Sequence, residues 1–276
     1  ARRQRQMCIR DRKKGIEFLE QQFGVKWDWD AFWKNAEMYN ESSRCMIEKW
    51  DVNCTEHPQV CGAALALQRE YEFMAAACMD KFMHKTDLRV TKMMLKGYEQ
   101  DKAANAPQPK YRCLVWACPA HYYTNFTYWT QHCWGVTCVN DMEAMLSYQP
   151  ITIGDKEQAL ADLVRCYEKM MMRSHTNGGY VNLLDECWKM CEKFHTNIVI
   201  MYDHVSCKNV GGLHGLFEDQ ARERGIHLIW IPHDVMDPRT VSRREMREAF
   251  SQYMVTVLNE KPLDPTLLDY EDTLSW

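Results

Sequence analysis

The chain of 276 residues lacks the features that would place it in a membrane, on a secretory route or on nucleic acid. No apolar run approaches the roughly 20 residues that a spanning helix needs. A net charge of −4 gives no electrostatic reason to expect nucleic acid or a membrane surface as a partner. No secretory signal precedes the cysteines, and their number is odd, so we expect no disulfide framework. These absences together indicate a cytoplasmic globular protein.

What is present fits an ordinary folded domain of unusual thiol content. Hydrophobic residues make up 46% of the chain and charged residues 26%, and the length allows one large core or two modest ones. The 13 cysteines are accompanied by 18 methionines and 10 tryptophans. We expect most of these thiols to be small buried hydrophobes, as for Cys166, Cys187 and Cys191 within helical patterns.

The pattern of the N-terminal part predicts a leader followed by a helical domain. Residues 1–13 are basic and without periodicity, so we expect a non-native or disordered leader, either a cloning scar or a truncated junction. Residues 14–104 carry helical patterns: Gly24 ends the first, Asp28 or Asp30 caps the second, and two more cover about 63–83 and 88–98. Residues 105–110, which include two prolines, form a linker.

Beyond the linker, strands and helices alternate over residues 111–262, and residues 263–276 form a tail. The expected strands are 112–117, 134–139, 198–202 and 227–231, with a possible short strand at 151–153. The expected helices are 122–132, 156–171, 180–194, 213–224 and 242–258. This alternation predicts an α/β fold with a mostly parallel, doubly wound sheet of the flavodoxin or Rossmann type, preceded by the helical domain.

Right-handed crossovers bring the four loops that follow the strands to one rim of such a sheet, where ligands bind. We therefore expect Cys118, Cys138–Asp141, Cys207 and Asp234–Arg239 to face this rim. The most informative stretch leads to Cys207, because an apolar strand pattern ends there in a short polar turn before Gly211 and Gly212. A thiol in that place is positioned to bind a ligand or cofactor.

This turn, His204-Val205-Ser206-Cys207-Lys208, resembles the Asn-Arg-Ser-Cys-Lys turn in the C-terminal domain of the 2-hydroxyacyl-CoA dehydratase and benzoyl-CoA reductase family. Two further stretches share the resemblance. Asp234-Val-Met-Asp-Pro-Arg239 is similar to the family's Asp-x-x-Asp-Pro-Arg run, and Gly24–Asp30 with Asn40 resembles its inserted helical region. The resemblance runs from about Gly15 to Leu258.

The resemblance implies a radical enzyme in which a [4Fe-4S] cluster donates one electron to a CoA thioester, so that a ketyl radical expels the 2-hydroxyl group. Cys207 would be one cluster ligand, and Ser206, Lys208, His204 and Pro119 would contact the acyl-CoA substrate. The partners implied are a homologous second dehydratase subunit and an ATP-dependent activator. The family's other cluster cysteines lie in an N-terminal domain without a counterpart here, so we expect an N-terminally truncated subunit.

Two interpretations of the cluster remain open, because Cys118 and Cys138 could complete it locally or could be core thiols. The chain also departs from the family pattern, with Val205 in place of the usual arginine and Ala249 in place of a later one. Loss of a fixed cation removes a group that could steady a thioester or phosphate. The alternatives to dehydration are a benzoyl-CoA reductase-type subunit and a non-catalytic scaffold subunit.

Several smaller motifs can be interpreted as either functional or structural. His204 is either a base or a turn residue with a local hydrogen bond, and Gly211-Gly212 either binds phosphate or forms a tight turn. We expect Asp237-Pro238-Arg239 to be structural, with an internal ion pair. The gaps Cys113-x4-Cys118 and Cys133-x4-Cys138 are not those of zinc ribbons, so we expect no zinc there.

Overall fold

The computed structural model describes residues 2–69, 81–144, 149–169 and 171–269. Its four strands are β1 (Tyr111–Trp116), β2 (Val136–Asp141), β3 (Ile198–His204) and β4 (His227–His233). The helices are α1 (Arg2–Phe23), α2 (Trp29–Asn53), α4 (Lys81–Ala103), α5 (Phe126–Trp134), η1 (Met142–Ala144), α6 (Lys156–Lys169), α7 (Met171–Phe194), α8 (Lys208–Gly211), α9 (His214–Arg224), α10 (Arg243–Thr256) and η2 (Pro265–Leu267). Residues 63–69 are helical as well.

The strands form one parallel sheet in the order β2-β1-β3-β4. The chain leaves β1 in one direction to reach β2 and then returns past β1 to place β3 and β4 on the other side. A sheet whose order reverses in this way is doubly wound, and its strands are buried on both faces. The core of β1 and β3 is accordingly a continuous apolar run, fully buried from Leu114 to Trp116 and from Ile198 to Met201. The predicted α/β fold is confirmed.

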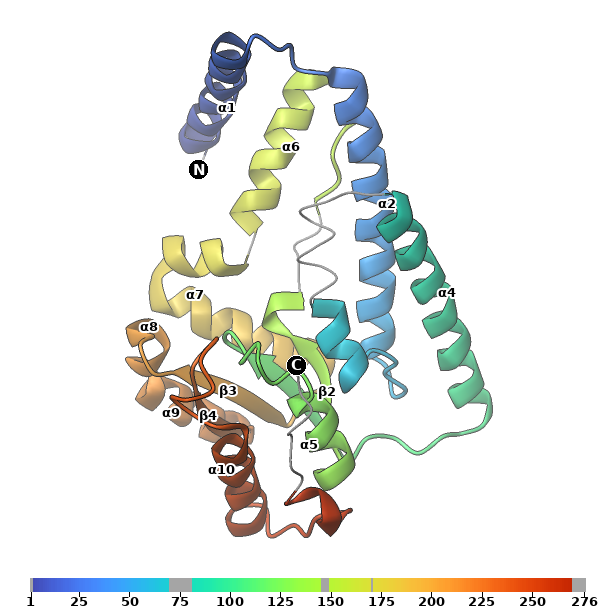
Figure 1. The fold of residues 1–276 in the computed structure, drawn as a ribbon, viewed down its shortest axis with the longest axis vertical. Coiled ribbons are helices and arrows are strands. Elements are labelled where there is room, and N and C mark those ends of the chain that lie inside the picture. Colours follow the sequence, from blue (N-terminus) through green and yellow to red (C-terminus); the bar gives the residue numbers. More distant parts are fainter. Residues whose placement is uncertain (1, 70–80, 145–148, 170, 270–276) are drawn as a thin grey trace.

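Helices cover the sheet on both faces (Figure 1). On one face α5 and α10 meet, where the rings of Phe126 and Phe250 lie edge to face at 5.8 Å. On the other face α7 and α9 meet through Trp188 and Phe217, whose ring centroids are 5.7 Å apart. Gly179, at φ +69°, interrupts the helical geometry of α7, so that the straight helix begins at the predicted Tyr180. Two aromatic layers thus hold the sheet between the helices.

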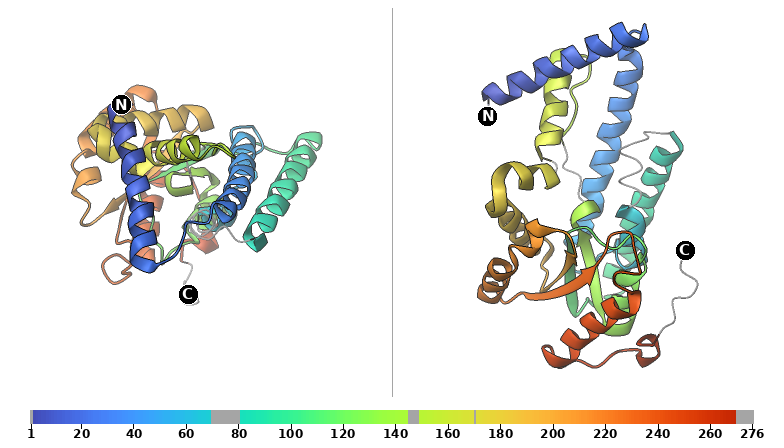
Figure 2. Two further views of the ribbon diagram at one scale, coloured as in Figure 1. Left: turned by 90° about the horizontal axis from the view of Figure 1, so that it is seen from above. Right: turned by 60° about the vertical axis from the view of Figure 1, so that its left-hand side comes forward.

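The long helices α1 and α6 stand beyond one end of the sheet, and α2 and α4 run from there down beside it (Figures 1 and 2). α6 lies between β2 and β3 in sequence, yet it packs against α1. Its Ala159 joins Ala36 of α2 in a small second core, with Phe32 and Trp33 around it. A buried ion pair between Lys49 and Asp87 links α2 to α4. The helical region is therefore built from two separate stretches of chain, and the predicted division at residues 105–110 stays a prediction.

Local sequence signals explain where the first helices end. Gly24 takes the left-handed conformation, φ +65°, directly after α1. The Asp28 carboxylate accepts a hydrogen bond from the backbone N–H of Ala31 at 2.9 Å and caps α2, as predicted. Residues 2–13 are the first half of α1, while their origin as a leader stays a prediction. The predicted helix over 63–83 falls partly outside the described residues.

The possible strand at 151–153 is wrong. The side chain of Asn40 occupies both backbone groups of Ile151, accepting from its N–H and donating to its C=O at 2.8 Å each. With these groups bonded to α2, no ladder to a neighbouring strand can form there. The stretch instead anchors the loop before α6 to the helical region.

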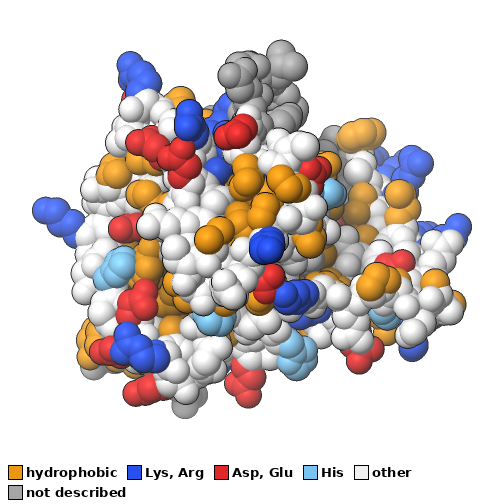
Figure 3. Space-filling model, turned by 90° about the horizontal axis from the view of Figure 1, so that it is seen from below, with side chains coloured by type: hydrophobic (Ala, Val, Ile, Leu, Met, Phe, Trp, Pro, Cys, Tyr) orange, Lys and Arg blue, Asp and Glu red, His pale blue; other side chains and the backbone are white. Residues whose placement is uncertain are grey.

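Charges of both signs are interspersed on the face of the molecule seen from below, around a central group of hydrophobic side chains (Figure 3). Among the described residues, no helix combines the length and the apolar character needed to cross a membrane.

Candidate functional site

The carboxyl ends of β1 and β3 flank the point where the strand order reverses, and a cavity of about 330 Å³ lies there. In open α/β sheets this crevice is where ligands bind, because the loops on its two sides diverge. Its lining residues lie at the ends of β1 and β3, in the loops after all four strands and at one position of α7: Trp116, Ala117, Cys118, Met142, Glu143, Leu183, Tyr202, His204, Cys207, Asn209, Val210 and Val235. The lining is largely apolar, with a few polar groups and two thiols.

Cys207 lies in this cavity, in the turn that follows β3. Its backbone N–H donates to the C=O of His204 at 2.9 Å, and its own C=O accepts from Gly211 at 3.1 Å. The residue thus stands at the start of the short helix α8, with a half-buried thiol that lines the cavity. The placement of Cys207 at the rim is as expected, while its role as a metal ligand stays a prediction.

The four residues expected to contact substrate are placed differently from one another. His204 lines the cavity, whereas Ser206 and Lys208 are exposed and do not line it. Pro119 is buried, and its C=O lies 3.9 Å from the Sγ of Cys118. Only His204 of this group therefore faces the cavity directly, and substrate contact by all four stays a prediction.

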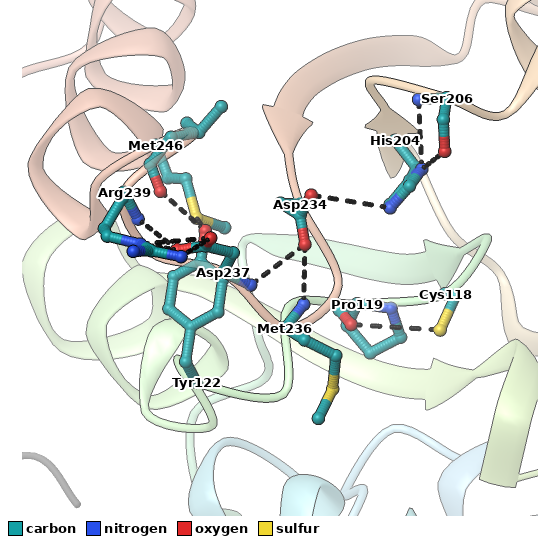
Figure 4. Close-up of polar contacts among 11 residues, drawn as sticks. Cys118, Pro119, Tyr122, His204, Ser206, Asp234, Met236, Asp237, Arg239 and Met246 are labelled. Atoms are coloured by element: carbon teal, nitrogen blue, oxygen red, sulfur yellow. Dashed lines mark hydrogen bonds and ion pairs between the residues drawn. The ribbon is translucent and has the colours of Figure 1, made fainter.

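His204 is fixed between its own turn and Asp234 (Figure 4). Its Nδ1 accepts from the backbone N–H of Ser206 at 3.1 Å, which assigns the ring proton of the neutral form to Nε2. Nε2 lies 4.0 Å from the Asp234 carboxylate. Backbone N–H groups of Met236 and Asp237 hold the pKa of Asp234 below its ordinary value. The local hydrogen bond predicted for His204 is present, and the imidazole also connects the ends of β3 and β4.

The Asp237-Pro238-Arg239 stretch carries an ion pair, but it lies at the surface and not in the interior as predicted, because the Arg239 side chain is exposed. The Asp237 carboxylate accepts from the Arg239 guanidinium at 2.6 Å and from its backbone N–H at 3.0 Å (Figure 4). These bonds lower the pKa of Asp237 to about 2. The helix that follows is capped by Ser242, which forms a capping box with Glu245. The stretch shapes the loop after β4.

The two glycines after Cys207 form a turn. The N–H of Gly211 donates to Cys207 and the N–H of Gly212 to Lys208, so both groups are already bonded within the chain. A Cβ at Gly212 would lie 2.8 Å from the carbonyl oxygen of Lys208, which explains the glycine there. These bonds favour the interpretation as a tight turn, because a bound phosphate would need N–H groups that are free to donate.

A second group of polar side chains lies beside the cavity. Cys118, in the loop after β1, has its Sγ 3.9 Å from the Nε2 of His121. Glu143, in η1 directly after β2, completes the group, and one potential ligand atom from each residue lies within 4.8 Å of the others. All three residues are half-buried. Thiol, imidazole and carboxylate are the three kinds of side chain that bind transition metals.

Burial dominates the electrostatics of this group. It raises the pKa of the Cys118 thiol, and the neighbouring Glu143 carboxylate raises it further. Burial likewise raises the pKa of Glu143. The Oε2 of Glu143 is buried without a hydrogen-bond partner among the described residues. Burial therefore disfavours the charged forms of both the thiol and the carboxyl group.

Cys138 does not face the rim, contrary to expectation. It lies within β2, fully buried, with its Sγ 3.7 Å from the Oγ1 of Thr130 in α5. Cys113 sits opposite it on β1 and is fully buried too. The core interpretation therefore holds for Cys138, and its part in a local completion of a cluster is ruled out by position. Cys187 and Cys191 are buried as expected, whereas Cys166 is half-buried.

The thiols available in the cavity do not suffice for a four-iron cluster. Such a cluster is held by four thiolates, or by three with one open iron position. Of the cysteines that the structure describes, Cys118 and Cys207 line the cavity. The described residues thus fit one side of a cluster site and do not complete it.

Sequence reasoning missed His121 and Glu143. The short spacing Cys118-x2-His121 after a strand is a chelating pattern that could have drawn attention to His121. No spacing signal marks Glu143, because it reaches the group from the loop of another strand, 25 positions after Cys118.

A doubly wound parallel sheet with a thiol-lined cavity at its switch point defines an α/β protein with a cavity at the carboxyl ends of its strands, where proteins of this architecture bind ligands. Comparison with protein families makes the assignment more specific. The chain belongs to the 2-hydroxyglutaryl-CoA dehydratase, D-component family, whose profile matches residues 2–254. This confirms the family suspected from the sequence and identifies the chain as a dehydratase component. A comparison with curated proteins found no match.

Proposed function

We propose that the protein is a subunit of an iron–sulfur 2-hydroxyacyl-CoA dehydratase, which removes water from a 2-hydroxyacyl-CoA by a ketyl-radical mechanism. The observation that carries this proposal is the position of Cys207, the family-type cysteine, in a cavity at the switch point of the sheet. The family description supports dehydration over ring reduction.

The cavity suits the acyl part of such a substrate. Side chains of Trp116, Leu183 and Val235 line it, so an acyl group would replace water against an apolar surface. His204 contributes the imidazole among the described lining residues, with its Nε2–H directed toward Asp234. Its proposed task is to orient a polar substrate group at the mouth of the cavity.

Cys207 would supply one thiolate to the cluster. The remaining thiolates would come from residues outside the described part of the chain or from a partner subunit. We propose the partners that the family resemblance implies, namely a homologous second subunit and an ATP-dependent activator.

A non-catalytic scaffold subunit is the second candidate. It is favoured by the burial of Cys138 within β2, which leaves too few thiols in the cavity for a complete cluster. Val205 supports it as well, since an exposed valine stands where the family has an arginine.

Anaerobic reconstitution separates these two functions. The chain would be purified together with the proposed second dehydratase subunit and incubated with iron and sulfide. If the chain is a subunit of the active enzyme, it is expected to gain the visible absorbance and the paramagnetic signal of a cluster. The variant Cys207→Ala is expected to lose the cluster that this chain binds. Cys187→Ala is the matched control, because that thiol is buried in α7 away from the cavity. A complex that stays colourless, or colour unaffected by Cys207→Ala, would contradict the catalytic role.

A further inference from the structure

We infer that Cys118, His121 and Glu143 form a binding site for a single divalent transition-metal ion of the zinc class at the edge of the cavity. The site is independent of the proposed dehydration and of the Cys207 cluster ligand. It gives Cys118 a role other than that of a cluster thiol.

The geometry of the three side chains matches a mononuclear site. With Zn–S near 2.3 Å and Zn–N near 2.0–2.1 Å, tetrahedral angles place sulfur and nitrogen about 3.6 Å apart. The Sγ of Cys118 and the Nε2 of His121 are 3.9 Å apart, and the nearest carboxylate atom of Glu143 completes a set within 4.8 Å. One ion can therefore contact all three with small side-chain rotations.

The identity of the ligands selects the ion. A thiolate and an imidazole favour zinc or its neighbours over Mg²⁺ and Ca²⁺, which prefer oxygen ligands. Glu143 adds an anionic group whose Oε2 is buried without a hydrogen-bond partner among the described residues. A bound cation would satisfy this oxygen and would compensate the two negative charges that burial disfavours.

The backbone holds the three residues in place from three directions. Ala117, in the left-handed conformation at φ +65°, turns the chain so that Cys118 leaves the line of β1. The N–H of His121 donates to the C=O of Val235 after β4, at 2.9 Å. The N–H of Glu143 donates to the Asp141 carboxylate at 2.8 Å. The site therefore unites the loops after β1, β2 and β4.

The number of ligands indicates what the ion would do. Structural zinc is enclosed by four protein ligands, whereas catalytic zinc keeps three and leaves a position open. Among the residues that the structure describes, three ligands are present, and both Cys118 and Glu143 line the cavity. The open position would thus take a water molecule or an oxygen of a carbonyl or carboxylate compound bound in the cavity.

Cobalt substitution tests the site directly. The full chain, freed of metal with a chelator under anaerobic conditions, would be titrated with Co²⁺ without sulfide. We expect one Co²⁺ per chain, with the visible bands of tetrahedral cobalt and a thiolate-to-cobalt charge-transfer band, and displacement by Zn²⁺. Cys118→Ala should remove the charge-transfer band. His121→Gln and Glu143→Gln should each weaken binding by about 100-fold, since loss of an outer partner alone costs roughly 10- to 100-fold.

Two controls make the outcome specific. Cys207→Ala should keep the full cobalt spectrum, and His132→Gln, an exposed histidine on α5, should bind as the wild type does. Should Cys118→Ala not fold, as judged by circular dichroism, His121→Gln tests the same site at a half-buried turn. Absence of the charge-transfer band in the wild type, or its loss in Cys207→Ala alone, would overturn the inference. Because no iron or sulfide is present, neither result depends on cluster formation.

Discussion

Asp141 and Arg69 form a buried ion pair in which the guanidinium Nη1 lies 3.0 Å from the carboxylate Oδ2, with both side chains almost wholly excluded from solvent. The other carboxylate oxygen of Asp141 accepts from the N–H of Glu143. One aspartate at the end of β2 therefore joins the helical segment 63–69 to the residue that contributes the carboxylate of the inferred metal site.

The first prediction concerns this pair. Asp141→Asn should lower the free energy of unfolding by about 3–5 kcal/mol, because it removes the carboxylate charge that faces the buried Arg69 guanidinium. Urea denaturation would measure the loss. The double variant Arg69→Met/Asp141→Leu, which replaces both charges by apolar groups, should recover most of the stability. It should still bind Co²⁺ more weakly, because it no longer positions Glu143. Equal stability of the single and double variants would show that the pair does not act as described.

The second prediction concerns His233, which is fully buried at the end of β4 beside the rings of Tyr202 and His204. Burial lowers its pKa from 6.5 to about 4. Between these values the unfolded chain binds a proton that the folded chain does not, so stability should fall as pH is lowered from about 6.5 to about 4. The contribution of His233 to this fall should be of order 2–3 kcal/mol.

Denaturation curves of wild type and His233→Phe across this range would isolate that contribution. The phenylalanine keeps the ring contacts but cannot bind a proton, so its curve should be flatter. His132→Gln, in which an exposed histidine is replaced, should follow the wild type. A His233→Phe curve as steep as the wild type would exclude His233 as the cause.

The third prediction concerns the turn that carries Cys207. Gly212→Ala places a Cβ about 2.8 Å from the carbonyl oxygen of Lys208, so the backbone must shift. We expect a loss of stability of about 1–3 kcal/mol and weaker incorporation of any cluster that depends on Cys207. Gly215→Ala is the matched control, because its Cβ meets nothing within 4 Å, and it should be neutral or slightly stabilising. Thermal unfolding of the two variants side by side would reveal the difference, and identical behaviour would refute it.

The fourth prediction concerns the start of α10. Ser242 accepts from the N–H of Glu245 at 3.2 Å, and the Glu245 carboxylate accepts from the N–H of Ser242 at 2.7 Å. Ser242→Ala should therefore cost about 1 kcal/mol, measured by urea denaturation, whereas Ser251→Ala within the same helix should not. The bonds to Ser242 lower the pKa of Glu245, so this stabilisation is present above the ordinary glutamate pKa and is lost as pH falls. An equal cost for both variants would argue against the capping box.

Much of the fold could be predicted because burial leaves a direct mark on the sequence. The apolar runs of β1 and β3 and the periodic helices around them gave correct elements in the correct order. Gly24 and Asp28 were recognisable since their conformations and hydrogen bonds depend on residues only a few positions away. Features that depend on such local signals could therefore be predicted individually from the sequence.

The candidate site was only partly predictable, because it depends on contacts between distant residues. Cys207 could be placed at the rim, since it follows a strand directly. Cys138 could not be placed, because β2 extends to Asp141 and keeps the thiol inside the strand. Glu143 joined Cys118 and His121 through the order of β1 and β2 in the sheet, which no pattern in a single segment encodes. The strand predicted at 151–153 was wrong for the same reason, because the Asn40 side chain that bonds to Ile151 is 111 positions away in the sequence.

The return of α6 to the helical region has a consequence for how the chain can be divided. Ala159 of α6 is buried against α2, so the segment after the linker is held by contacts with the segment before it. A protease cut within residues 105–110 would break one covalent connection and leave the contacts between α6 and α2 in place. The two fragments should therefore migrate together in gel filtration, as a single noncovalent complex.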